Sequence, residues 1–176
     1  DFHLFLPSRF PTDLWIADDG STDGTVEFLK EKGLPFETGE NQGISWNKNK
    51  IICRFMGYDY VFLLEDDLKL LKPFWADLFI EALSVSGENH LCYVPEYLGR
   101  EFARPRVNHE FKGFSIIENF AASGVFMVFT GKALRLLGGF DTRFVKYGHE
   151  HSNFTERVFR SGLNRFAWPH LKESEE

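Results

Sequence analysis

Two short acidic clusters mark where this sequence could do chemistry. Asp18 and Asp19 open the first cluster, Glu65, Asp66 and Asp67 form the second, and each follows an apolar run. Ligands of open α/β sheets bind beyond the carboxyl ends of the strands, so both clusters are placed to meet one. Because side chains alternate along a strand, we expect Glu65 and Asp67 on one side and Asp66 on the other. A carboxylate pair of this kind suits a hard divalent cation that keeps water and phosphate oxygens as its other ligands.

The alternative is that each cluster is a solvated turn whose acids cap the following helix. Either cluster alone would fit that interpretation. The occurrence of both, each directly after a buried strand, favours a ligand site.

The pattern of apolar residues predicts the elements that would hold these clusters. Strands are expected at residues 2–6, 14–17, 60–64 and 124–129, and helices at about 23–32, 47–56, 73–85, 132–137 and 152–160. Ser152 is the expected N-cap of the last helix, and residues 87–120 look irregular. The alternation of strands and helices predicts an α/β three-layer sandwich with a mainly parallel central sheet.

One spacing conflicts with this scheme. A crossover between neighbouring parallel strands needs a dozen or more residues, whereas only about seven separate residues 2–6 from 14–17. Either a helix-bearing segment between Arg9 and Thr12 is absent from this sequence, or residues 2–6 are not a central strand.

Composition limits the function classes. The 176 residues carry a formal net charge of −6, which disfavours a nonspecific nucleic-acid binder. No apolar run is long enough to span a membrane. The two cysteines exclude a disulfide framework and fit a reducing compartment, so a cytoplasmic location is expected.

Three segments of the first half resemble glycosyltransferases of the GT-A fold, especially family 2. Ile16–Thr25 resembles the family's first nucleotide-binding signature. Phe62–Asp67 resembles its metal-binding DxD motif, with Glu65 in place of the first Asp. Asn41–Asn49 resembles its N-x-G-x-x-x-A-R-N loop, with Lys48 at the position of the Arg.

Two segments of the second half continue the resemblance in the family's order. Ser123–Asp141 resembles the strand and turn before the acceptor site, and Tyr147–His151 resembles the GxED acceptor and catalytic segment. The resemblance implies a single GT-A domain over residues 1–176. Residues 1–86 would bind the nucleotide sugar, and residues 87–176 would bind the acceptor.

The resemblance also implies roles on the base side of the donor. Asp18 or Asp19 would accept a hydrogen bond from the nucleotide base, with uracil N3–H as the favoured donor. Pro7, Ser8 and Arg9 would lie beside the same base.

On the phosphate side, Glu65 and Asp66 would contact the nucleotide sugar, Glu65 through the ribose, and Asp67 would bind Mn²⁺ or Mg²⁺. That metal would stabilise charge on the departing nucleoside diphosphate. Lys48 would add positive charge there, or would be a solvated helix lysine. Many enzymes of this fold complete the metal shell with a late histidine, for which His170 is the candidate.

Glu150 is the leading candidate for the general base that deprotonates the acceptor hydroxyl. The sequence departs from the family at the next position, where His151 replaces the usual Asp. This change leaves His151 open as the base, since an imidazole titrates near neutrality.

The sequence therefore predicts a metal-dependent, inverting glycosyltransferase. It would move a sugar from a nucleotide-diphosphate sugar, with a UDP-sugar favoured, to a hydroxyl of a glycan or glycoconjugate. The alternatives are a sugar-1-phosphate nucleotidyltransferase and a noncatalytic module that binds a nucleotide sugar or a glycan.

Overall fold

The computed structural model describes residues 8–93, 107–119, 121–145 and 148–175. The strand expected at residues 2–6 lies outside the described residues. The helices and strands are β1 (Ile16–Ala17), α1 (Thr25–Glu31), β2 (Phe36–Glu37), α2 (Ile44–Phe55), β3 (Tyr60–Leu64), α3 (Trp75–Ser86), β4 (His90–Tyr93), β5 (Val107–Phe111), β6 (Phe114–Glu118), β7 (Phe126–Thr130), α5 (Gly131–Leu137), α6 (Glu150–Arg160), β8 (Pro169–Leu171) and a closing 3₁₀ helix, η2 (Lys172–Glu175).

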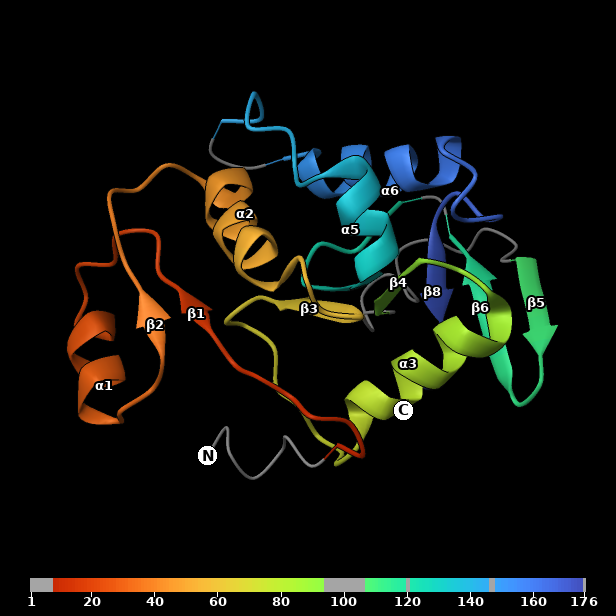
Figure 1. The fold of residues 1–176 in the computed structure, drawn as a ribbon, viewed down its shortest axis with the longest axis horizontal. Coiled ribbons are helices and arrows are strands. Elements are labelled where there is room, and N and C mark those ends of the chain that lie inside the picture. The colour runs from red at the N-terminus through yellow and green to blue at the C-terminus, as the bar shows by residue number, and fades with distance from the viewer. Residues whose placement is uncertain (1–7, 94–106, 120, 146–147, 176) are drawn as a thin grey trace.

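The elements build a layered α/β sandwich. Among the described strands, six form one sheet in the order β3-β7-β4-β8-β6-β5, while β1 and β2 form a separate parallel pair. Helices α2, α5 and α6 cover one face of the larger sheet, and α3 covers the other (Figure 1). This arrangement confirms the predicted α/β class. No helix in the described part of the chain is long and apolar enough to cross a membrane.

The larger sheet is mixed, which corrects the expectation of a mainly parallel one. β4 and β8 are parallel neighbours, whereas the other four neighbouring pairs are antiparallel. Strands β5 and β6 must be antiparallel because only Lys112 and Gly113 connect them, too few residues for a crossover. Gly113 has a φ of 84°, a backbone conformation that favours glycine in such a turn.

The segment expected to be irregular, residues 87–120, contains three strands of this sheet. The signal for β5 was present as the alternation of Val107, His109 and Phe111 with polar residues, but it is short. Strand β4 begins with His90, a residue that a hydrophobic pattern does not mark as buried although it is fully buried here. The prediction failed where polar side chains occupy strand positions.

Strand β7 separates two hydrophobic cores. Met127 and Phe129 belong to the core beneath α2, α5 and α6, whereas Phe126 and Val128 belong to the core beneath α3. This division follows from the alternation of side chains along a strand.

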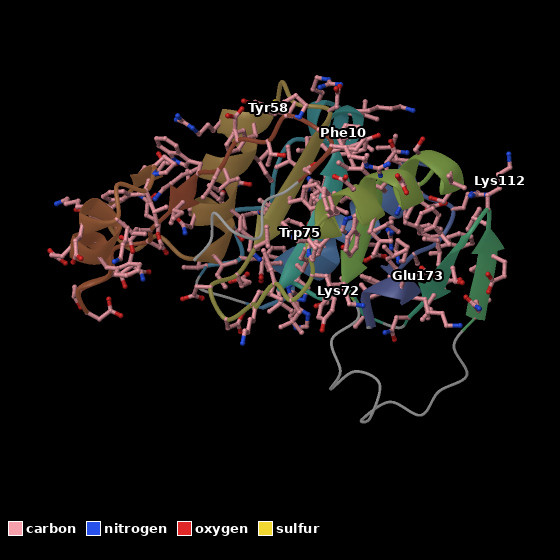
Figure 2. All side chains as sticks on the ribbon, turned by 90° about the horizontal axis from the view of Figure 1, so that it is seen from below. Phe10, Tyr58, Lys72, Trp75, Lys112 and Glu173 are labelled. Atoms are coloured by element: carbon pink, nitrogen blue, oxygen red, sulfur yellow. The ribbon has the colours of Figure 1, made fainter. Side chains whose placement is uncertain are left out.

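The second core is rich in aromatic rings. Trp75 lies at the start of α3 (Figure 2). Its ring packs edge-on against Phe62 of β3 and Phe126 of β7, with centroid distances of 5.2 and 5.6 Å. These contacts hold α3 against β3, the strand that the second acidic cluster follows.

His90 is a buried polar residue beside the other core, and both of its ring nitrogens form hydrogen bonds. Its Nδ1–H donates to the carbonyl of Val128 at 2.8 Å, so Nε2 carries the lone pair that accepts from the Thr155 hydroxyl at 2.9 Å. The ring also stacks on Phe129, with centroids 4.2 Å apart. Burial lowers the pKa of His90 to about 3, and neighbouring His170 acts in the same direction.

We predict that this histidine makes the fold acid-sensitive. The unfolded chain would protonate His90 below about pH 6.5, whereas the folded chain keeps it neutral down to about pH 3. Its contribution is therefore complete above pH 6.5 and is lost as the pH falls. The free energy of unfolding should drop by about 2 kcal/mol between pH 6.5 and 5, at the linkage slope of one proton.

Urea denaturation at several pH values would measure this slope. His90→Gln should flatten it, while His109→Gln, a change to a half-buried histidine of β5, serves as the control. A slope that is unchanged by His90→Gln would contradict the assignment.

Candidate functional site

Asp18 shapes the loop that follows β1. The carboxylate is buried and accepts from the backbone N–H groups of Gly20, at 3.1 Å, and Ser21, and from the hydroxyl of Thr38. Burial alone would raise its pKa, but the hydrogen bonds from Ser21, Thr38 and Gly20 together hold the pKa below its usual value. Asp18 is thus an ionised group whose partners are supplied largely by the protein itself.

Asp19 caps the beginning of α2. Its two oxygens accept from the backbone N–H groups of Gln42 at 3.0 Å and Gly43 at 2.8 Å. Asn47, one turn into α2, donates to the carbonyl of Ala17 at 2.7 Å and secures the same junction. An ionised carboxylate has about four acceptor positions, so the partly exposed Asp19 keeps capacity for a donor group of a ligand.

Lys48 connects α2 to the second acidic cluster. Its ammonium forms an ion pair with Glu65, which follows β3, and donates to the carbonyl of Gly124 at 3.1 Å. Only 12% of its side chain is exposed, so the alternative of a solvated helix lysine is wrong. The first turns of α2 therefore contact both acidic clusters.

Asp66 and Asp67 lie exposed beyond the end of β3. The strand stops at Leu64, and the backbone N–H of Leu68 donates back to Glu65 across a turn. The strand alternation used to place Glu65 opposite Asp66 therefore does not extend through the cluster. Within the described residues, neither Asp66 nor Asp67 has a hydrogen bond or an ion pair with another side chain.

The donor set fits a hard divalent cation in part. In the described portion of the chain, no three His, Cys, Asp or Glu side chains come together as a complete metal site. Two exposed carboxylates in adjacent positions, Asp66 and Asp67, still offer the oxygen ligands that Mn²⁺ and Mg²⁺ take together with water and phosphate. Glu65 is engaged by Lys48.

His170 is not placed to complete that set. It lies fully buried in β8, and its Nδ1 is 3.0 Å from the carbonyl oxygen of Trp168. The sheet order puts β8 three strands from β3, or roughly 14 Å at the usual strand spacing. The expectation that His170 and Asp67 share a metal is corrected, because a sequence pattern gives the order of strands along the chain and not across the sheet.

Ser8 and Arg9 also lie elsewhere than expected. Both bind Asp77 of α3, Ser8 through its hydroxyl and Arg9 through its backbone N–H and its Nε at 2.8 Å, and Arg9 pairs with Glu81 as well. An extended segment without helix or strand separates them from β1 (Figure 1). These contacts fasten the chain to α3, so the expectation that Ser8 and Arg9 lie beside the nucleotide base is corrected. Pro7 lies outside the described residues.

Glu150 and His151 begin α6. The helix starts two residues before the expected cap Ser152, after His149 in the left-handed conformation with a φ of 67°. Glu150 is 3% exposed, and its oxygens accept from the N–H of Gly148 at 2.7 Å and from Nδ1 of His151 at 3.1 Å. Burial opposes its ionisation, but the hydrogen bonds from His151 and the backbone prevail and lower its pKa to about 2.

Gly124 lies in contact with both Lys48 of α2 and His151 of α6. Its carbonyl accepts from Lys48, and a Cβ at this position would lie 2.9 Å from Nδ1 and 3.0 Å from Cγ of His151. Only glycine leaves room for the imidazole ring against the main chain. The acidic end of β3 and the start of α6 therefore meet across one residue, and the sequence offered no sign of this role for Gly124.

Asn49 is a second structural residue that the sequence pattern did not identify. Its side-chain amide donates to the carbonyl of Phe140 at 2.9 Å and accepts from the N–H of the same residue at 2.7 Å. A side chain at Gly139 would collide with that amide. This pairing fixes the turn after α5 against α2.

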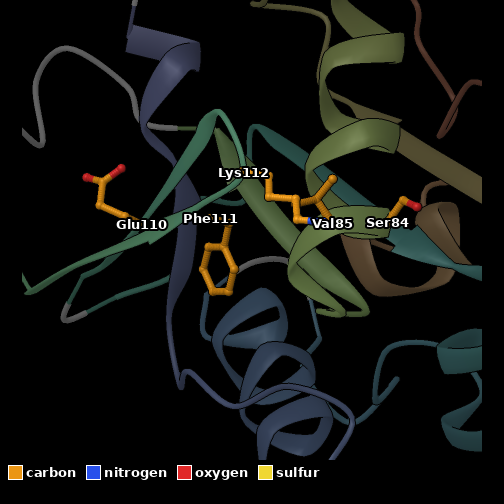
Figure 3. A pocket seen from close by; sticks show the side chains of 5 residues that line it. All are labelled: Ser84, Val85, Glu110, Phe111 and Lys112. Atoms are coloured by element: carbon orange, nitrogen blue, oxygen red, sulfur yellow. The ribbon is translucent and has the colours of Figure 1, made fainter.

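A groove of about 650 Å³ lies at the opposite edge of the sheet (Figure 3). It is lined by Ser84 and Val85 of α3 and by the β5–β6 hairpin residues Glu110, Phe111 and Lys112. Strands β5 and β3 are the two opposite edges of the larger sheet, so this groove is separate from the acidic clusters.

The chain is similar to known proteins in its sequence and in its fold. The sequence profile of glycosyl transferase family 2 matches residues 8–144. An uncharacterized glycosyltransferase, R363, of Acanthamoeba polyphaga mimivirus is 27% identical over 128 residues, which cover 70% of this chain and 48% of the viral protein.

Among solved structures, the mannosyltransferase PcManGT from Pyrobaculum calidifontis, in complex with GDP-Man and Mn²⁺, superposes with a TM-score of 0.58. The identity is 16%, and the match covers 89% of this chain and 46% of the mannosyltransferase, so it carries the fold alone. The chain spans about half the length of each of these two relatives. The resemblance noted in the sequence is confirmed: the chain belongs to glycosyl transferase family 2.

Proposed function

We propose that this chain transfers a sugar from a nucleotide-diphosphate sugar to a hydroxyl of a glycan or glycoconjugate. The observation that carries this proposal is the meeting of two pairs, Lys48–Glu65 and Glu150–His151, on either side of Gly124. The first pair lies where the second acidic cluster begins. The second pair offers a base for the acceptor hydroxyl. Family membership and the fold of the mannosyltransferase support this interpretation.

The donor would lie over the ends of β1 and β3, with residues 1–86 supplying most of its contacts. Asp19 has spare acceptor capacity for the nucleotide base, and Lys48, five residues after Gly43 in α2, places its ammonium beside Glu65 at the end of β3. The sequence favours a UDP-sugar, whereas the similar mannosyltransferase was solved with GDP-Man, so both nucleotides belong in the test.

A divalent cation would be held by Asp67, with Asp66 beside it. When bound, Mn²⁺ or Mg²⁺ would act as a Lewis acid that stabilises charge on the leaving diphosphate. The chain's own residues orient the reaction: Lys48 is fixed by Glu65 and Gly124, and a base near Gly124 takes the proton of the acceptor. A single displacement of this kind would invert the anomeric centre.

We expect the full chain to release nucleoside diphosphate from UDP-sugars or GDP-mannose when Mn²⁺ and a hydroxyl acceptor are present. Because the acceptor is the nucleophile, release should rise with acceptor concentration. Chromatography of the nucleotides would measure it. Release of pyrophosphate would instead identify a nucleotidyltransferase, and binding without turnover would identify a noncatalytic module.

We expect the metal to be required for both donor binding and transfer. A chain with net charge −6 and an exposed acidic turn should repel a diphosphate unless a cation intervenes. Asp67→Asn should abolish turnover without changing the thermal midpoint, while Asp59→Asn, another aspartate on the surface, should leave turnover intact. Full activity in excess EDTA would refute the metal requirement.

We expect Asp19 to read the nucleotide base. Asp19→Asn keeps the shape of the side chain but replaces an acceptor oxygen by a donor nitrogen. The binding free energy of UDP or GDP should therefore become less favourable by about 1–3 kcal/mol. Isothermal titration would compare it with Asp23→Asn, an exposed aspartate of the same loop. Equal affinities in the two variants would show that Asp19 does not take part in base recognition.

A further inference from the structure

The two acid–base candidates at the start of α6 are not equivalent in the structure. Glu150 is almost completely buried and has both oxygens engaged, by Gly148 and by His151. The side chain of His151 is 27% exposed. The residue that can meet an incoming hydroxyl is therefore the histidine.

The hydrogen bond between them assigns the proton on the imidazole. A carboxylate only accepts, so the 3.1 Å contact requires that Nδ1 of His151 carries the hydrogen. In the neutral ring Nε2 then holds the lone pair, and it bonds to no residue in the described part of the chain. The basic nitrogen is free for a substrate, and the carboxylate behind the ring can stabilise the imidazolium that forms.

Gly124 fixes where the ring lies. The main chain at Gly124 packs against the imidazole, and the same residue's carbonyl holds Lys48. Through Gly124 the ring is linked to Lys48 of α2, which forms an ion pair with Glu65 after β3. The histidine is thereby placed next to the end of β3 where the donor diphosphate is proposed to bind.

We infer that His151 is the general base of the transfer and that Glu150 is the residue that positions it. This inference rests on the proposed transferase function. Nε2 of His151 takes the proton of the acceptor hydroxyl as the hydroxyl oxygen forms its bond to the anomeric carbon. The bond between that carbon and the diphosphate oxygen breaks, and its electron pair leaves with the nucleoside diphosphate. The imidazolium then returns the proton to water.

The roles expected from the family resemblance are thus reversed. A carboxylate whose pKa lies at about 2 is a weak base at neutral pH, and Glu150 has little surface to offer to a substrate. The same buried and ionised state suits a group that holds an imidazole in one tautomer.

Steady-state transfer measured between pH 5 and 9 would test this inference on four variants of the full chain. His151→Ala should lower kcat by roughly 10²- to 10⁴-fold, the usual contribution of a general base, while the affinity for UDP or GDP with Mn²⁺ stays the same. Added imidazole should restore part of the rate. The acid limb of the pH profile should disappear.

The Glu150 variants separate positioning from catalysis. Glu150→Gln removes the charge that stabilises imidazolium, so the acid limb should move to lower pH and kcat should fall less than in His151→Ala. Glu150→Asp keeps a carboxylate and should recover part of both effects. His109→Gln, which removes a histidine beside Glu118 on the β5–β6 hairpin, should leave the profile unchanged.

The outcomes distinguish a failure of this inference from a failure of the proposed transferase function. If the parent transfers sugar but His151→Ala retains its rate, or if Glu150→Gln abolishes the acid limb, then Glu150 is the base and the inference is overturned while the function stands. If the parent binds UDP or GDP and transfers no sugar, both are overturned.

Discussion

The ammonium of Lys48, whose side chain is only 12% exposed, is the constraint on which the arrangement of the site depends. Removing a charged amine from water is costly unless the protein supplies a countercharge and hydrogen bonds. Glu65 supplies the charge and the carbonyl of Gly124 supplies a hydrogen bond. These two partners lie after β3 and before β7, so movement of either strand end away from α2 would cost the ammonium one of its two partners.

The same helix extends this constraint to β1. Asp19 binds the backbone at the beginning of α2, and Asn47 holds the carbonyl of Ala17. The small β1–β2 sheet is separate from the larger sheet. Within the described residues, α2 connects this small sheet to the rest of the site. A helix with charged and amide side chains on its first turns can therefore hold in place strands that do not pair with each other.

The sequence predicted the elements that are long or strongly apolar. β3 was predicted at residues 60–64 as observed, and α2, α3 and α5 were found within a few residues of their ends. The two acidic clusters and Lys48 were recognised because residue type and position after a strand are visible in a linear sequence. The same motifs gave the family, which the profile match confirms.

The rest depended on contacts between distant segments. His170 is buried three strands away from Asp67 because the order of strands across a sheet is not written in their order along the chain. Ser8 and Arg9 bind Asp77 of α3, and no local pattern predicts that partner. Glu150 was the leading candidate for the general base, whereas the structure buries it with a hydrogen bond from the backbone just before its own helix.

The pairing of Asn49 with the main chain of Phe140 has a consequence for how this protein can change in evolution. The amide of Asn49 forms the same pair of hydrogen bonds with Phe140 that the main chain of a neighbouring strand would form. It reaches Phe140 only because position 139 has no side chain. The ring of Phe140 lies 5.7 Å from the ammonium of Lys48. Positions 49 and 139 should therefore be inherited together. A substitution at either position should first change the electrostatic environment of Lys48.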